Sequence, residues 1–284
     1  MTRGMRMRRL AGPVPLRLSV LSSVLLLLFG GSSPAFGADG PSWSARGVAT
    51  FAGRAFDACS APPLATMRAW GASPYRAVGV YVGGRARACP QPELNAGWLR
   101  GVRGLGWSVL PLYVGSQAPC VQAANKKKYR LGEDPMGTGT EEGRDAVRAA
   151  RELGIAARSP LYLDVEAYDE RRAECAAAVL SFVRAWDRAV TAEGYVPGFY
   201  SSVDSGVAQL ERERRAGTAD LPEVMWFAHW TGRASLDAPE VLAPQAWTPQ
   251  RRIHQYEGNV TETYGGQALS IDRNQVDAPV ATLG

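Results

Sequence analysis

Residues 161–168 have the sequence LYLDVEAY, in which aliphatic side chains alternate with carboxylates and aromatic rings. In a β-strand, successive side chains point to opposite faces of the sheet, so this alternation predicts a strand with two unlike faces. We expect the aliphatic face to pack on helices and the acidic face to point into the interior of a curved sheet. The aliphatic face holds Leu161, Leu163 and Val165, and the acidic face holds Tyr162, Asp164, Glu166 and Tyr168.

Seven further apolar runs, rich in β-branched and aromatic residues, lie on both sides of this stretch, and segments of helical pattern separate many of them. This order is typical of βα units repeated around a parallel sheet, and eight strands close a TIM-type barrel. The sequence therefore predicts an α/β fold, a single (β/α) TIM-type barrel, with a less regular second half where the helical patterns are weaker. The eight runs are Val48 to Asp57, Ala77 to Gly83, Ser108 to Val114, Pro160 to Ala167, Val196 to Ser201, Val224 to Trp230, Arg252 to Tyr256 and Leu269 to Asn274.

Two helices of the outer wall are predicted in detail. Thr140 can cap a helix that ends at Gly154. Apolar residues recur at helical spacing from Arg172 to Ala192, and Gly194 ends this second helix. The segment from Val121 to Gly139 has no strong period, and we expect a long loop at the mouth of the barrel.

Residues 1–37 predict a secretory signal peptide. Five arginines form a basic head, Leu18 to Phe29 form an apolar stretch, and Ala35-Phe36-Gly37 offer a small-residue cleavage site. The apolar stretch is shorter than the roughly 20 residues that span a bilayer, so we expect cleavage and no stable membrane insertion, with an uncleaved membrane anchor as the alternative. The mature protein is then one barrel domain, residues 38–284, and we expect it to be secreted, or to be associated with the cell wall if the resemblance described below holds. General secretion is favoured, although Arg8-Arg9 keeps twin-arginine export open.

The basic character of the whole chain belongs to this segment. The chain carries 32 Lys and Arg and 27 Asp and Glu, and removing the five arginines of residues 1–37 leaves 27 basic against 27 acidic residues. Nucleic-acid binding needs clustered Lys and Arg, so this balance argues against a nucleic acid as partner. Lys126-Lys127-Lys128 is a basic run that we interpret as a solvated loop, with an anion-binding patch as the alternative.

Four cysteines in an exported chain predict two disulfides. Cys59, Cys89, Cys120 and Cys175 lack the close pairs of a zinc site, so we expect no metal. Each cysteine follows one of the first four predicted strands. Of the three connectivities, we favour Cys59 with Cys89 and Cys120 with Cys175, because both pairs then join loops of neighbouring strands.

Asp164 and Glu166 are the strongest functional signal. Adjacent carboxylates disfavour each other's ionisation, so one can stay protonated as a general acid while the other stays charged. The alternative is a surface strand paired with arginines. Asp57 ends the first run, and Asp272 shares one face of the last run with Asn274. Barrel enzymes hold their chemistry at the carboxyl ends of the strands, so we expect Asp57, Asp164 and Asp272 to share one pocket there.

Aromatic residues on or near strand ends point to carbohydrate binding, because flat rings beside polar groups stack on sugars. For each ring, packing in the core is the alternative. A Ser-His-Asp arrangement is not indicated, since the chain has two histidines and no G-x-S-x-G sequence. The candidate rings are Tyr81, Tyr113, Tyr200, Trp226, Trp230 and Tyr256.

Two families resemble this sequence. Over nearly the whole mature chain it is similar to the secreted glycoside-hydrolase-like proteins of the domain of unknown function 1906 family, and five segments in order resemble the strand motifs of family 25 glycoside hydrolases, the muramidases that cut peptidoglycan. The first likeness rests on Phe56-Asp57-Ala58-Cys59, Val80-Tyr81-Val82-Gly83-Gly84, Tyr113-Val114-Gly115 and Gly198-Phe199-Tyr200-Ser201-Ser202. The second rests on Phe56-Asp57, Leu163-Asp164-Val165-Glu166, Trp226-Phe227-Ala228-His229-Trp230, His254-Gln255-Tyr256 and Ile271-Asp272-Arg273-Asn274.

The family 25 resemblance implies a modified TIM barrel in which Glu166 is the general acid. Asp57, Asp164 and Asp272 would complete the acidic set. An Asp two residues before a catalytic Glu also occurs in chitinase-type barrels, where it orients the substrate's own N-acetyl group as nucleophile. Gln255 and Asn274 join the rings as expected sugar-binding residues.

The sequence therefore predicts a secreted glycoside hydrolase that acts on a peptidoglycan-like cell-wall glycan by acid catalysis from Glu166, assisted by Asp164. The alternative is a non-catalytic glycan-binding protein on an inactive barrel, since a fold does not determine a function. A barrel hydrolase with another target bond is a third possibility. We expect cell-wall polysaccharide as the partner, a monomer and no cofactor.

Overall fold

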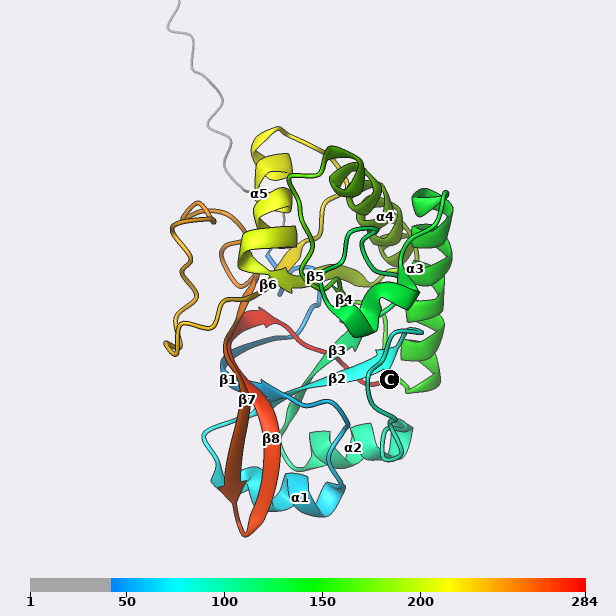
Figure 1. Ribbon diagram of the computed structural model, residues 1–284. Coiled ribbons are helices and arrows are strands. Elements are labelled where there is room, and N and C mark those ends of the chain that lie inside the picture. Colours follow the sequence, from blue (N-terminus) through cyan, green and yellow to red (C-terminus); the bar gives the residue numbers. More distant parts are fainter. Residues whose placement is uncertain (1–41) are drawn as a thin grey trace, which may run out of the picture. The chain divides into compact units, whose positions relative to one another are not determined.

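The strands of residues 42–284, the part that the computed structural model describes, form one closed barrel in the order β1 to β8 (Figure 1). Consecutive strands from β1 to β7 pair in parallel, whereas β8 runs antiparallel to both β7 and β1 and closes the barrel. This confirms the predicted barrel and its less regular second half. The strands are β1 (Thr50–Asp57), β2 (Ala77–Gly83), β3 (Ser108–Tyr113), β4 (Pro160–Asp164), β5 (Val196–Ser202), β6 (Val224–Ala228), β7 (Arg252–Tyr264) and β8 (Gln267–Pro279).

The antiparallel last strand corrects the expectation of a sheet built only from parallel βα units. A tight turn joins β7 to β8, and its residues Gly265 and Gly266 have φ angles of 56° and 76°. Two successive positive φ angles are the geometry of a hairpin turn, which glycine adopts without steric cost. The paired β7 and β8 run past the barrel toward α1 (Leu64–Ala69) (Figure 1).

Helices cover the outside of the barrel, and the long pair α3 and α4 lie side by side (Figure 1). The predicted helix over residues 172–192 is confirmed as α4, with Gly194 at a φ of 80° after its end. The remaining helical elements are η1 (Trp70–Ala72), α2 (Ala96–Gly104), η2 (Ala124–Tyr129), α3 (Pro135–Glu152), α4 (Ala173–Ala192), η3 (Val203–Val207) and α5 (Ala208–Arg215).

The start of α3 was predicted wrongly. The helix begins at Pro135, where the Asp134 side chain accepts a hydrogen bond of 2.8 Å from the Gly137 backbone N–H. An Asp cap followed by Pro at the first position is a strong helix start, so α3 begins five residues before Thr140. The predicted loop from Val121 to Gly139 is therefore shorter and also contains η2.

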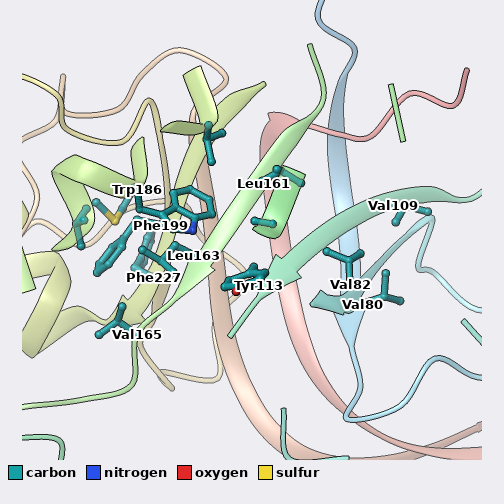
Figure 2. Packing of buried hydrophobic residues seen from close by; sticks show 14 of the residues in the cluster. Val80, Val82, Val109, Tyr113, Leu161, Leu163, Val165, Trp186, Phe199 and Phe227 are labelled. Atoms are coloured by element: carbon teal, nitrogen blue, oxygen red, sulfur yellow. The ribbon is translucent and has the colours of Figure 1, made fainter. Parts of the chain in front are cut away.

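Side chains of β4 divide between two apolar layers, as the alternation predicts. Leu161, Leu163 and Val165 pack outside the barrel with Trp186 of α4 (Figure 2). Tyr162 points inward to Trp226, with 5.4 Å between the ring centroids. Side chains fill the interior of the barrel and pack closely against one another.

Glycines on two strands make room for the inner rings. A Cβ at Gly198 would lie 2.4 Å from the Tyr162 ring, and one at Gly79 would lie 3.0 Å from the Trp226 ring. These positions therefore require glycine for close packing.

Disulfides join Cys59 to Cys89 and Cys120 to Cys175, which is the favoured pairing. Among residues 42–284, no helix is long and apolar enough to cross a membrane. The predicted signal peptide, residues 1–37, lies outside the described residues.

Candidate functional site

Asp57 ends β1 at the mouth of the barrel and is 3% exposed. Its Oδ2 accepts hydrogen bonds from Asn274 Nδ2 at 2.7 Å and from Gln255 Nε2 at 3.1 Å. Burial and the nearby Asp272 carboxylate raise the pKa of Asp57 to about 7, against the effect of both hydrogen bonds. The site thus holds a carboxyl group that can change its charge near neutral pH.

Asp272 lies directly opposite Asp57 in the β1–β8 register. Asp272 is the sixth of the 13 residues of the antiparallel strand β8, so it does not end its strand as predicted, but it does lie beside Asp57 as predicted. Its Oδ1 accepts a hydrogen bond of 2.6 Å from the Asn259 N–H. Burial and the Glu166 carboxylate raise the pKa of Asp272.

Asp164 is the last residue of β4 and is 2% exposed. Its Oδ1 is buried without a hydrogen-bond partner among the described residues. Burial, followed by the Glu166 charge, raises the pKa of Asp164 well above its ordinary value. A charge on a buried oxygen without a hydrogen-bond partner is costly, which agrees with the raised pKa of Asp164.

Glu166 follows β4 and keeps 33% of its side chain exposed. Lys126 Nζ lies 3.3 Å from its Oε1 and donates a hydrogen bond of 3.1 Å to the Ala86 carbonyl oxygen. Lys126 is buried, whereas Lys127 and Lys128 are exposed. The solvated-loop interpretation was therefore wrong for Lys126, because η2 turns this one residue of the run inward.

Gln255 of β7 connects the carboxylates to the aromatic side of the site. Its Oε1 accepts hydrogen bonds from the Tyr200 hydroxyl at 3.0 Å and from Trp230 Nε1 at 3.1 Å. Its Nε2 donates to Asp57 and also lies 3.4 Å from Asp272 Oδ2. One amide therefore orients two rings and two carboxyl groups.

A pocket of about 360 Å³ opens beside this network. Trp230 is 57% exposed at its edge, and Tyr200 is partly buried in it. Tyr81 is partly buried near Asp164, and burial together with that charge raises its pKa. The pocket is lined by Glu166, Ala167, Tyr200, Ser202, Val203, Asp204, Ala228, His229, Trp230 and Gln255.

Four predicted sugar-binding rings do not line this pocket, and Tyr81 is one of them. Tyr113 points outward into the core around the barrel (Figure 2), and its hydroxyl donates to Asp145 Oδ2 of α3 at 2.8 Å. Tyr256 is next to inward-facing Gln255 and so faces outward. Trp226 is fully buried inside the barrel, where its Nε1 donates to the Asn274 side chain at 2.8 Å.

The side chains of Tyr256 and Tyr168 both pack on the outside of the barrel. The Tyr256 ring lies 6.1 Å from that of His254, on the outer face of β7. Tyr168 also leaves the predicted inner face, because β4 ends at Asp164 and the chain then turns. The Tyr168 hydroxyl donates to Gln209 Oε1 of α5 at 2.7 Å.

Sequence reasoning did not predict two sets of contacts at the site, those of Lys126 and those of Gln117. Gln117 is fully buried; its Nε2 donates to the Asp164 carbonyl oxygen at 3.0 Å, and its Oε1 accepts from the Glu166 N–H at 2.9 Å. No sequence pattern links a loop residue to a strand 49 positions away. Within residues 42–284, no cluster of three or more His, Cys, Asp or Glu side chains could hold a metal ion.

Two proteins of known structure are similar to this chain, and the first of them supports the fold. An uncharacterized B. stearothermophilus protein of known structure is 19% identical, with a TM-score of 0.54, over 80% of this chain and 99% of its own. A muramidase from Acremonium alcalophilum is 16% identical, with a TM-score of 0.46, over 78% of this chain and 92% of its own. No curated protein matches significantly. Residues 68–276 match the family described as Rv2525c-like, glycoside hydrolase-like domain, and the chain therefore belongs to this family.

Proposed function

We propose that this chain hydrolyses a β-linked N-acetylhexosamine glycan of the cell wall, with Glu166 as the general acid. The observation that carries the proposal is that Glu166 lines the pocket and is 33% exposed, whereas Asp57 and Asp164 are 3% and 2% exposed. A general acid must come within hydrogen-bond reach of the leaving oxygen. Glu166 meets this requirement better than either buried aspartate.

Asp164 would assist by binding the substrate. Asp164 lies two residues before Glu166, as the assisting Asp of chitinase-type barrels does, and would orient an N-acetyl group that acts as the internal nucleophile. Asp164 and Glu166 are two residues apart on one segment, so they do not straddle a sugar as a nucleophile and an acid would. Glucose polymers, which lack the N-acetyl group, should remain uncut.

Trp230 supports a glycan as the ligand. Its ring packs so closely on the Gly258 backbone that a Cβ there would lie 2.1 Å from the ring, and its Nε1 donates to Gln255. The ring is thus held in place while 57% of the residue is exposed, which suits stacking on a sugar. The ordered motifs that resemble family 25 muramidases favour peptidoglycan, and two disulfides favour an oxidising, extracellular location.

A second candidate function is glycan binding without turnover. The Lys126 ammonium group lies 3.3 Å from Glu166 Oε1, so this carboxyl group is already engaged in an ion pair within the protein. In this case the pocket and the Trp230 ring would bind a wall glycan and release it unchanged.

The test compares the wild-type chain with Glu166→Gln on purified peptidoglycan, chitin oligomers and cello-oligomers, with new reducing ends measured by mass spectrometry. We expect cleavage of the N-acetylated glycans and a loss of about 100-fold or more in the variant, because the amide cannot donate a proton. Glu133→Gln, at an exposed position, is the matched control and should retain activity.

The other possible results of this test distinguish between the two candidate functions and between the possible roles of Glu166 and Asp164. Binding without new reducing ends would favour the second candidate. Full activity in Glu166→Gln would remove Glu166 from the acid role, and loss of its circular dichroism spectrum would make Glu166 a structural carboxylate. Cutting of cello-oligomers, or a glycosyl ester on Asp164, would exclude the N-acetyl mechanism.

A further inference from the structure

Residues 115–131, called the strap here, follow β3 and cross the end of β4. Val121 forms an antiparallel bridge with Tyr168, and the Gln122 N–H donates to the Ala167 carbonyl oxygen at 2.9 Å. The disulfide from Cys120 fastens the strap to α4. The strap is thus hydrogen-bonded to the segment that carries Glu166.

The strap also bonds to itself around Gln117. The Gln117 N–H donates to the Tyr129 carbonyl oxygen and the Leu131 N–H donates to the Gln117 carbonyl oxygen, both at 2.8 Å. Arg85 from the β2–α2 connection donates to the Ser116 hydroxyl at 2.8 Å. The backbone at Gln117 is therefore held from both sides, and its side chain can act as a fixed support.

The side-chain amide of Gln117 forms hydrogen bonds of the kind that a neighbouring strand would form with the backbone after β4. Pairing of β3 with β4 ends at Leu163, so the peptide groups beyond it lie outside that register. The amide donates to the Asp164 carbonyl oxygen and accepts from the Glu166 N–H, which satisfies one polar group on each side of Val165. A buried side chain with both amide ends used in this way determines the path of the backbone.

Lys126 acts on the same residue from the other end of the strap. Its ammonium group contacts the Glu166 carboxylate and the Ala86 carbonyl oxygen, and only 8% of its side chain is exposed. Lys126 also opposes the raised pKa of Asp164, which burial and Glu166 cause. Backbone and carboxylate of Glu166 are therefore both held by one segment.

We propose that the strap is the positioning element of the site: Gln117 holds the backbone of Glu166, and Lys126 holds its carboxylate toward the pocket. This inference rests on the proposed function, in which Glu166 is the acid. Neither strap residue needs to touch the sugar. The rings of Tyr200 and Trp230 and the amide of Gln255, on or after β5 to β7, line the pocket and would contact the sugar instead.

The kinetic test uses Gln117→Met and Lys126→Met in the full chain with peptidoglycan as substrate. We expect kcat to fall about 10- to 100-fold with little change in KM, because a displaced acid slows the reaction while the sugar contacts remain. Lys126→Arg, which keeps a positive charge, should recover part of the loss. Gln122→Met and Lys127→Met, at exposed strap positions, are the matched controls and should behave as wild type.

A second measurement does not depend on activity. Hydrogen exchange of the Glu166 backbone N–H, followed by NMR, should become at least about tenfold faster in Gln117→Met and remain unchanged in Lys127→Met, because Gln117 is the acceptor of that N–H. A wild-type chain that cuts no glycan would refute the proposed function, and faster exchange in Gln117→Met would still support the strap. Unchanged exchange, or a loss confined to KM, would overturn the positioning role.

Discussion

The substitution Asp57→Asn directly tests how much free energy it costs to bury a charged carboxylate at this site. Asp57 Oδ2 accepts both of its side-chain hydrogen bonds, from Asn274 and from Gln255. The single carbonyl oxygen of an asparagine can take the place of Oδ2 and keep both bonds. The substitution therefore removes the ionisation of a 3% exposed group while leaving its size and these contacts nearly unchanged.

The magnitude follows from the pKa of Asp57, which burial and Asp272 raise from 3.8 to about 7. A carboxyl group whose folded pKa is raised binds its proton more tightly in the folded state, so wild-type stability falls as pH rises between these two values. At 1.36 kcal/mol per unit, the ionised group costs about 4 kcal/mol above pH 7 and almost nothing below pH 4. Asp57→Asn should avoid this cost.

The assay is urea unfolding of both proteins at pH 4.5, 6 and 8. The free energy of unfolding of Asp57→Asn minus that of wild type should increase by about 3 kcal/mol from pH 4.5 to pH 8, because about 1 kcal/mol of the cost is already present at pH 4.5. Asp237→Asn, whose side chain is 81% exposed, is the control and should show no comparable increase. A difference for Asp57→Asn that is equal at all three pH values would refute the reasoning.

Three further predictions concern the scaffold. Gly79→Ala should lower the free energy of unfolding by about 1–3 kcal/mol in urea, because its Cβ would lie 2.7 Å from the Cβ of Asp57. Glu211→Gln should cost about 2–3 kcal/mol at pH 7, since it breaks a buried carboxylate's bonds to two arginines. Burial raises the pKa of Glu211 but those bonds lower it further, so this cost should disappear as pH falls through the folded pKa. Replacing Cys120 and Cys175 together by Ala opens a loop of 55 residues and should cost about 4 kcal/mol in thermal or urea unfolding.

The strands could be predicted because each is a short apolar run whose alternation marks an inner and an outer face. Strand ends were harder, since burial by the surrounding helices decides where pairing stops. The predicted run to Trp230 ends at Ala228 in β6, and the freed Trp230 becomes the exposed ring of the pocket. The direction of β8 did have a signal: Gly265-Gly266 between two alternating runs is typical of a hairpin.

Two features were the hardest to predict from the sequence. One is the face of the sheet on which a given aromatic ring lies, and the other is which distant segments contact each other. Tyr113 and Tyr256 belong to strands whose inner face is determined by their neighbours Leu112 and Gln255, and a one-residue shift moves a ring to the opposite face. Lys126 is one of three consecutive lysines, and composition gives no reason to choose it. Its role follows only from the fold of the strap.

The charges of the site connect substrate recognition with acid formation in the proposed function. Burial and Glu166 raise the pKa of Asp164 and so favour its protonated form, while Lys126 Nζ lies 3.3 Å from Glu166 Oε1. An N-acetyl N–H that donates to Asp164 would favour its charged form, because a hydrogen bond to the ionised state lowers a carboxyl pKa. The released proton would then be available to the adjacent Glu166, whose pocket the same sugar shields from water. A glycan without the N-acetyl group would leave the proton on Asp164, which gives a second physical reason why glucose polymers should remain uncut.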